Sequence, residues 1–161
     1  MNEIETKARE IEGLLDEEIR LERELAGALA AQGEALLQGA PEGLERSSRT
    51  LGETFEAVRV AARERRRATD EIATILGRRS GAALRDLLGE VPSPWRGTLE
   101  ERRRSLSQAR RESTARGARN ASLARASLDA IASVRGLVDR AATHAEGPEA
   151  PPPLRRLDRR A

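Results

Sequence analysis

The sequence lacks cysteine and tyrosine, and its 161 residues include one histidine, one phenylalanine and one tryptophan. Without cysteine there is no disulfide, no thiol nucleophile and no zinc site with cysteine ligands. The single histidine, His144, also excludes a His-rich metal centre within one chain. The scarcity of aromatic side chains argues against a compact globule with an aromatic core. We therefore expect no cofactor, no metal, no small-molecule substrate and no enzymatic activity.

Long apolar runs and targeting signals are scarce as well. The longest stretch without a charge, residues 25–33, has nine residues, whereas a helix that spans a bilayer needs about 20. The acidic start, residues 1–10, differs from the basic and then apolar start of a secretory signal. We expect a cytoplasmic protein without membrane insertion.

Alanine, leucine and arginine dominate the residues that are present. Alanine and leucine together supply 47 residues and arginine 28, whereas valine and isoleucine supply 5 and 6. Strand-forming patterns are therefore scarce. Small apolar side chains each bury little area, so a stable fold needs long helices packed along extended seams. The sequence predicts an all-α fold: an elongated antiparallel helical hairpin or coiled-coil bundle of three long helices plus one short connecting helix.

Two long helices are expected in the first half of the chain. In the first, residues 2–38, the apolar residues cover an arc of about 160°. Gly39 and Pro41 end this helix, because glycine releases the last turn and proline cannot continue the hydrogen-bond ladder. The second, residues 42–76, has a heptad seam with alternating steps of four and three residues. The seam residues are Leu44, Ser48, Leu51, Phe55, Val58, Ala62, Arg65, Thr69, Ile72 and Leu76.

A short connecting helix follows the second long helix. Gly77 is a natural stop, and Ser80 is a candidate cap for the short helix. This helix carries Leu84, Leu87 and Leu88 before the next glycine.

The remainder of the chain is a third long helix and a tail. Ser93 is a candidate N-cap with Pro94 at the first helical position, and the helix runs to about residue 145. Residues 146–161 combine a proline run with arginines. We expect a helical domain over residues 1–145 and a disordered Pro/Arg-rich tail over residues 146–161.

The charges are distributed unevenly along the chain. Residues 1–45 carry 12 acidic and 4 basic groups, a net charge of −8, and residues 46–161 carry 15 acidic and 25 basic groups, a net charge of +10. Opposite charges on the two parts favour contact between them or the attraction of separate partners.

Local clusters of like charge are better explained by a solvated helix surface than by a binding site. The arginines within residues 63–67 and 102–104 stand beside carboxylates and have no aromatic residue near them to stack on a base. An Arg-driven nucleic-acid interaction, which would weaken steeply with salt, is therefore a minor alternative. The carboxylates at residues 16–18, Glu22 and Glu24 lack the Glu-x-x-His spacing of metal sites in bundles, and we assign them to a solvated face as well.

The later part of the third long helix carries more apolar surface than its own fold needs. Its apolar side chains spread over about 180° around the helix, whereas one core-facing stripe needs little more than about 100°. We expect the surplus to form a groove for a helical peptide of another protein. The candidate binding residues are Asn120, Leu123, Leu128, Ile131, Val134, Leu137 and Val138.

Two alternatives remain open for this surplus face. It either closes a homodimer, which would make the protein a structural coiled-coil adaptor, or packs on the short Leu84-containing helix. Trp95 is open in the same way, because such a residue either staples the start of a helix to the bundle or anchors a partner. Glycines inside the predicted helices each cost about 1 kcal/mol relative to alanine, so a partner would add stability.

Several segments resemble the FlgN-type flagellar export chaperones, which are small, cytoplasmic, all-helical bacterial proteins. In that family an acidic first helix with spaced leucines leads to a second long helix, a short Leu-rich link and a long last helix with an Asn-x-x-Asn-x-x-Leu-like segment. The matching segments here are EREL at residues 22–25, ALL at 35–37, ERR at 64–66, AALRDLL at 82–88, ARNASL at 118–123 and SLDAI at 127–131. The likeness covers about residues 10–140. Gly117 stands where the family has the first asparagine, and Asn120 matches the second.

The resemblance implies a non-enzymatic chaperone of flagellar type III export. Its clients would be the hook-filament junction subunits of the FlgK and FlgL type, whose aggregation-prone C-terminal helices it would cover in the cytoplasm. It would then present them to the flagellar export gate. Covering an amphipathic helix with a matching apolar surface requires no catalytic group.

Overall fold

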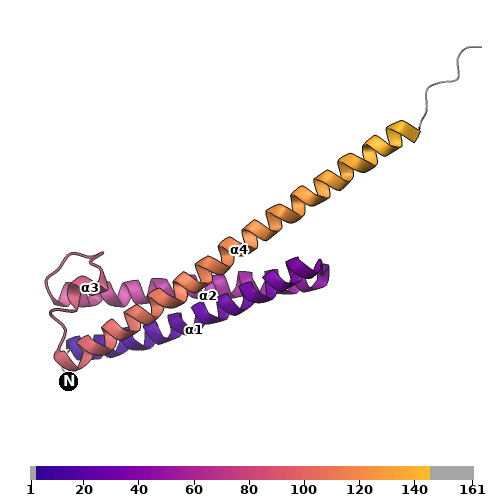
Figure 1. Ribbon diagram of the computed structural model, residues 1–161. Coiled ribbons are helices and arrows are strands. Elements are labelled where there is room, and N and C mark those ends of the chain that lie inside the picture. The colour runs from indigo at the N-terminus through magenta and orange to yellow at the C-terminus, as the bar shows by residue number, and fades with distance from the viewer. Residues whose placement is uncertain (1–2, 146–161) are drawn as a thin grey trace, which may run out of the picture. The chain divides into compact units, whose positions relative to one another are not determined.

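The computed structural model describes residues 3–145, with side chains for residues 3–141, and these residues form four helices and no strand. The helices are α1 (Glu3–Gln38), α2 (Pro41–Ile75), α3 (Leu84–Leu87) and α4 (Ser93–Ala145) (Figure 1). The predicted all-α class, with three long helices and one short one, is confirmed. The predicted tail at residues 146–161 lies outside the described residues.

The chain divides into two compact units, Met1–Ala124 and Arg125–Ala161. The first contains α1, α2, α3 and the beginning of α4, and the described part of the second is the remainder of α4. The division therefore falls within the helical domain that we predicted over residues 1–145.

In the first unit, α1 and α2 form the predicted antiparallel hairpin (Figure 1). Gly39 adopts φ +61°, a left-handed conformation that favours glycine and ends α1. The amide of Ala40 donates to the carbonyl oxygen of Ala35 at 3.0 Å, which closes the last turn. Pro41 then occupies the first turn of α2, where a missing N–H costs nothing.

The main core lies where the beginning of α1, the end of α2, α3 and the beginning of α4 meet. Ile11, Leu15, Ile72 and Leu99 are fully buried there, and the three leucines of the short connecting helix join them. The leucines around α3 therefore belong to the core of the first unit. A second, smaller cluster lies further along the hairpin and consists of Leu21, Leu25, Val58 and Ala61.

Trp95 packs partly buried against the main core at the start of α4. The guanidinium of Arg9 lies over its ring, 5.5 Å from the ring centre, in cation–π geometry. The structure therefore supports the first of the two roles left open for Trp95, which is to hold the start of α4 on the helical bundle.

Three local predictions need correction. Phe55, placed on the heptad seam of α2, is 56% exposed, whereas Val58 and Ala61 fill the contact with α1. Ser80 does not cap α3, because the N-cap is Ala83, which makes no side-chain capping bond. Ser93 is already the first helical residue of α4 and not its N-cap. The carbonyl oxygen of Pro92 accepts hydrogen bonds from the backbone amides of Trp95 and Arg96.

Candidate functional site

The apolar face predicted on the last helix is exposed to solvent. In the second unit, the side chains of five residues are between 59% and 65% exposed. They are Leu128, Ile131, Val134, Leu137 and Val138, and we call them the client face. Steps of three and four residues place Ile131, Val134 and Val138 close together on one side of the helix.

The rest of this helical segment consists of small and polar residues and carries both signs of charge. Asp129 and Arg135 are among the residues around the client face, and the hydroxyl of Ser133 donates to the backbone oxygen of Asp129 at 2.8 Å. A contiguous apolar stripe on an otherwise polar surface helix marks an interaction site. It is the sequence pattern of a helix that pairs with another amphipathic helix.

Asn120 and Leu123 belong to the first unit and lie against α1. Asn120 is buried, and its Nδ2 donates to the carbonyl oxygen of Leu29 at 2.7 Å and to Oε1 of Gln32 at 3.0 Å. Leu123 is half-buried and lines a small cavity of about 90 Å³ with residues of α1. The structure therefore separates these two residues from the other five candidates. It assigns the Asn120 amide to positioning α4 on α1.

The position of the Asn120 side chain against α1 depends on Gly33. A Cβ atom on Gly33 would lie 2.8 Å from Oδ1 of Asn120, closer than real Cβ contacts allow. Any side chain at this point of α1 would therefore have to displace the amide group of Asn120. Sequence reasoning did not identify this pair, because the glycine stands within an otherwise regular helical pattern.

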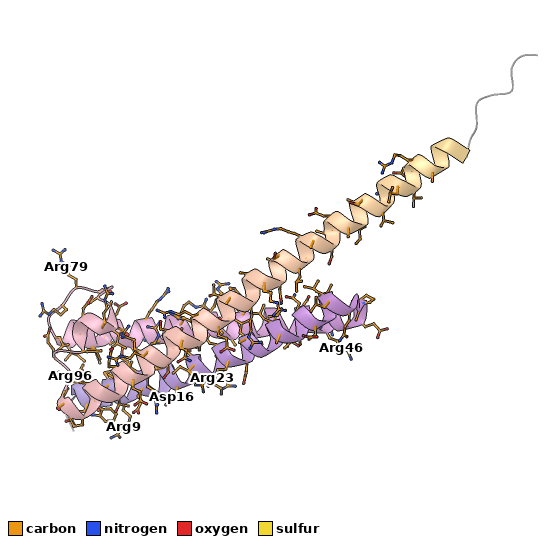
Figure 2. All side chains as sticks on the ribbon, viewed as in Figure 1. Arg9, Asp16, Arg23, Arg46, Arg79 and Arg96 are labelled. Atoms are coloured by element: carbon orange, nitrogen blue, oxygen red, sulfur yellow. The ribbon has the colours of Figure 1, made fainter. Side chains whose placement is uncertain are left out.

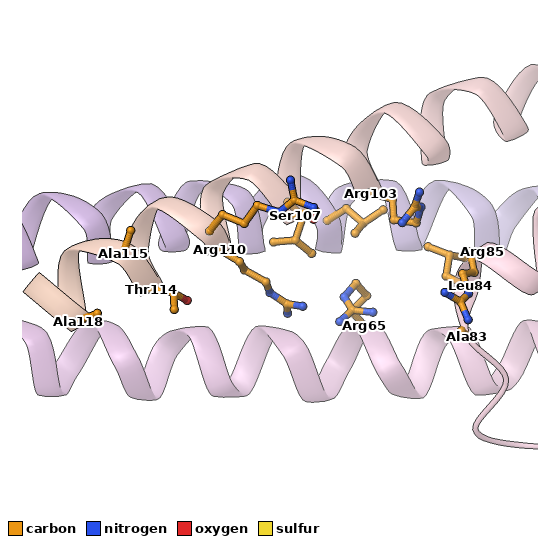
Figure 3. A pocket seen from close by; sticks show the side chains of 13 residues that line it. Arg65, Ala83, Leu84, Arg85, Arg103, Ser107, Arg110, Thr114, Ala115 and Ala118 are labelled. Atoms are coloured by element: carbon orange, nitrogen blue, oxygen red, sulfur yellow. The ribbon is translucent and has the colours of Figure 1, made fainter.

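A buried ionic cluster joins the three long helices of the first unit, and sequence reasoning missed it. Glu18 is fully buried, with Oε2 2.6 Å from Nε of Arg65 on α2 and Oε1 paired with Nη2 of Arg110 on α4. Glu22 accepts from the hydroxyl of Ser113 at 2.7 Å and lies 3.4 Å from Nε of Arg110. Figure 3 shows Arg65 and Arg110 reaching from their helices into the space between α2 and α4.

This cluster corrects the prediction that the carboxylates of α1 form a solvated face. Glu17 and Glu24 are indeed exposed and pair with Arg20. Glu18 and Glu22, in contrast, project into the contact with α2 and α4. The signal was available in the spacing: the series 11, 15, 18, 22, 25, 29 alternates steps of four and three, and it includes both buried glutamates among its apolar members.

Most arginines of the two basic clusters have carboxylate partners. In the first cluster, Arg65 pairs with Glu18, and Arg63 and Arg67 pair with Glu56 and Glu71 at 3.6 and 3.3 Å. Arg65 is therefore part of an interhelical contact, as its place on the predicted heptad seam indicated, and does not belong to the solvated surface that we expected for this cluster.

In the second cluster, Arg102 lies 2.8 Å from Asp16 of α1, which Figure 2 labels. Arg103 and Arg104 both donate to Glu100, and these hydrogen bonds lower the pKa of Glu100 to about 2.

The side chains described for residues 3–141 include no group of three or more His, Cys, Asp or Glu placed to hold a metal ion. In the same range, no helix combines the length and apolar character that crossing a bilayer requires.

Comparison with known proteins gives one match. Residues 1–146 match the family described as FlgN protein. Comparisons with curated proteins and with solved structures give no match.

Proposed function

The chain belongs to the FlgN family of flagellar export chaperones, and we propose that its clients are hook-filament junction subunits of the FlgK and FlgL type. The chaperone acts without catalysis in the cytoplasm, covers the C-terminal helices of the client and delivers the client to the export gate. The client helix lies on the client face of α4.

The observation that carries this proposal is the exposure of the client face. Large aliphatic side chains rarely gather in a row on the surface of a protein that has no partner. Asn120 and Leu123 lie against α1 and contribute to the proposal by holding the beginning of α4 on that helix.

The size of the client face suits a reversible complex. Removing the exposed part of one such side chain from water contributes about 1–2 kcal/mol, so five side chains contribute about 5–10 kcal/mol. Association costs about 4–15 kcal/mol in lost freedom of motion. The two terms are of similar size, so the client face does not by itself give tight binding, and the client can leave when the export gate takes it.

A binding assay with single aspartate variants tests the proposal. The full chain is titrated with a labelled peptide that contains the C-terminal helix of a FlgK-type subunit. Ile131→Asp and Val134→Asp should each weaken binding at least tenfold, because an unpaired charge would be buried in an apolar contact. Helicity by circular dichroism should stay unchanged, since both side chains are exposed in the free chain.

Gly136→Asp provides the matched control. Gly136 lies on the same helical segment, at least about 80° around the helix from each residue of the client face. This variant adds the same charge to the same segment and should bind the peptide normally. Undiminished binding by both client-face variants would refute the proposal. A stable dimer of the free chain that both variants dissociate would favour the homodimer instead.

A further inference from the structure

The first unit has an open groove between α2 and α4 that no part of the described chain fills. One part, of about 660 Å³, lies beside the buried ionic cluster and has Leu15, Leu84 and Leu106 among its lining residues (Figure 3). A second part, of about 700 Å³, continues along the hairpin. Both parts are lined by Arg110 and Thr114, so they form one surface. We call it the α2–α4 groove.

The second part of the groove has an apolar floor. Leu25, Leu29, Leu51 and Val58 line it, and Phe55 stands at its wall with 56% of its surface exposed. Phe55 therefore lines this groove, whereas the sequence predicted that it would be buried in the heptad seam. The only phenylalanine of the chain thus faces a hollow that could receive a further apolar side chain.

Small residues leave room for a helix along the groove. Gly52 on α2 and Gly117 on α4 line the second part, and Ala115 and Ala118 of α4 line the first. From Leu51 to Arg65, α2 rises about 21 Å, which matches four turns of a helix. A helix laid here would complete a four-helix arrangement with α1, α2 and α4.

The rim of the groove is positively charged. Five arginines and no carboxylate line the first part, and Glu22, held by Ser113, is the one carboxylate lining the second. Arg65 and Arg110 are neutralised by the ionic cluster below them. Arg66 on α2 and Arg111 on α4 are exposed, and neither makes an ion pair within the part of the chain that the structure describes. One unpaired cation therefore stands on each side of the groove.

We propose that the α2–α4 groove is a second docking surface, which binds an amphipathic helix of another protein with aspartate or glutamate on both sides of its apolar stripe. The apolar floor takes the stripe, and Arg66 and Arg111 pair with the flanking carboxylates. The aliphatic side chains of the floor favour this partner over a nucleic acid, whose charged phosphates gain nothing from an apolar surface. This surface is separate from the client face and does not depend on the identity of the client.

Two designed peptides test the chemistry of the partner. One is an 18-residue helix with leucine at helical i, i+3, i+4 and i+7 spacing and glutamate at the flanking positions, and its twin carries lysine in place of glutamate. Fluorescence anisotropy with the full chain should give at least tenfold tighter binding of the glutamate peptide, and this binding should weaken as salt is added. No saturable binding of the glutamate peptide, or equal binding of the two, would overturn the proposal.

Charge-reversal variants locate the contact. The double variant Arg66→Glu/Arg111→Glu should lower affinity for the glutamate peptide at least tenfold, and Phe55→Asp should lower it independently. The control is Arg23→Glu/Arg79→Glu, which changes the net charge equally at two exposed arginines outside the groove (Figure 2). Equal losses in the control and groove variants would refute the placement.

Two further measurements distinguish this proposal from binding at the client face and from dimerisation through the groove. Ile131→Asp should bind the glutamate peptide normally, so the groove and the client face can fail independently. Sedimentation of the free chain detects a second copy as occupant: a dimer that Phe55→Asp converts to monomer would overturn the proposal.

Discussion

Glu18 is the residue on which the contact between the three long helices of the first unit depends most. It is fully buried, and each of its two carboxylate oxygens meets a guanidinium from a different helix. A buried carboxylate is tolerated only when it is paired in this way. Removing it leaves Arg65 without its counter-charge in a confined contact and leaves Arg110 with Glu22 as its remaining carboxylate partner.

Replacing Glu18 by alanine should therefore lower the free energy of unfolding by about 3–5 kcal/mol. The matched control is Glu17→Ala, the neighbouring residue, whose exposed ion pair with Arg20 contributes less than about 1 kcal/mol. Urea denaturation followed by circular dichroism measures both. Equal effects of the two substitutions would contradict the assigned role of Glu18.

The contact between Gly33 and Asn120 gives a second prediction at this scale. Gly33→Ala should destabilise the protein, because the added methyl group must displace the Asn120 side chain and its two hydrogen bonds. Gly27→Ala on the same helix should instead stabilise it by up to about 1 kcal/mol, since nothing lies within 4 Å of its Cβ position.

A double-mutant cycle isolates this contact. In an Asn120→Ala background, the cost of Gly33→Ala should disappear, because the clashing oxygen is gone. An unchanged cost would show that some other neighbour opposes the methyl group.

At the scale of the helices, the sequence predicts where each one begins and ends better than what each one touches. Gly39, Pro41 and Gly77 act locally, so the bounds of α1 and α2 follow from the chain itself. The direction of Glu18 and Glu22 depends on partners from distant helices, with Arg110 lying 92 residues after Glu18. The helical periodicity places Glu18 and Glu22 on the inward side of α1, whereas their charge favours exposure to solvent. They are buried because Arg65 and Arg110 supply positive charges in the contact between the helices.

The apolar face of α4 was predictable for a related reason. Its exposure follows from an excess of apolar residues that can be counted on the helix alone. The packing of the Asn120 side chain on α1 was not predictable, because it depends on Gly33, which lies 87 positions earlier in the chain. The α2–α4 groove could not be foreseen either, since it arises from two helices packed on a third.

The α4 segment over residues 125–145 gives the prediction at this scale. Its large apolar side chains are exposed, so little packing stabilises it and its backbone amides should exchange faster than those of the core part of α1. Gly136→Ala should slow that exchange, because alanine favours helix by about 1 kcal/mol and the new methyl meets only the flexible end of Arg140 at 3.7 Å. Hydrogen exchange with mass spectrometry measures both effects. Slow exchange over this segment in the unsubstituted chain would contradict the prediction.

At the scale of the whole molecule, the uneven distribution of charge along the sequence leads to ion pairs within the first unit. Acidic groups of α1 meet basic groups from later in the chain, as in the pairs Asp16–Arg102 and Glu18–Arg65. The expected contact between the acidic and basic parts is thus observed. Among the residues whose side chains the structure describes, the buried apolar ones lie between Ala8 and Ala109.

Because that core ends before the client face, the residues after 145 should be dispensable for folding. A chain that ends at residue 145 should keep the thermal transition of the full chain. Differential scanning calorimetry of the two chains checks this, and loss of the transition in the shorter chain would show that the last residues contribute to the core.

Hydrogen exchange of the full chain, with and without the C-terminal peptide of a FlgK-type subunit, shows whether the client face of α4 binds the client. A client helix on this face should exclude water from the segment it covers and stabilise its helix. Saturating peptide should slow amide exchange over residues 125–141, and Ile131→Asp should abolish this protection. Binding of the peptide without protection of those residues would contradict this prediction.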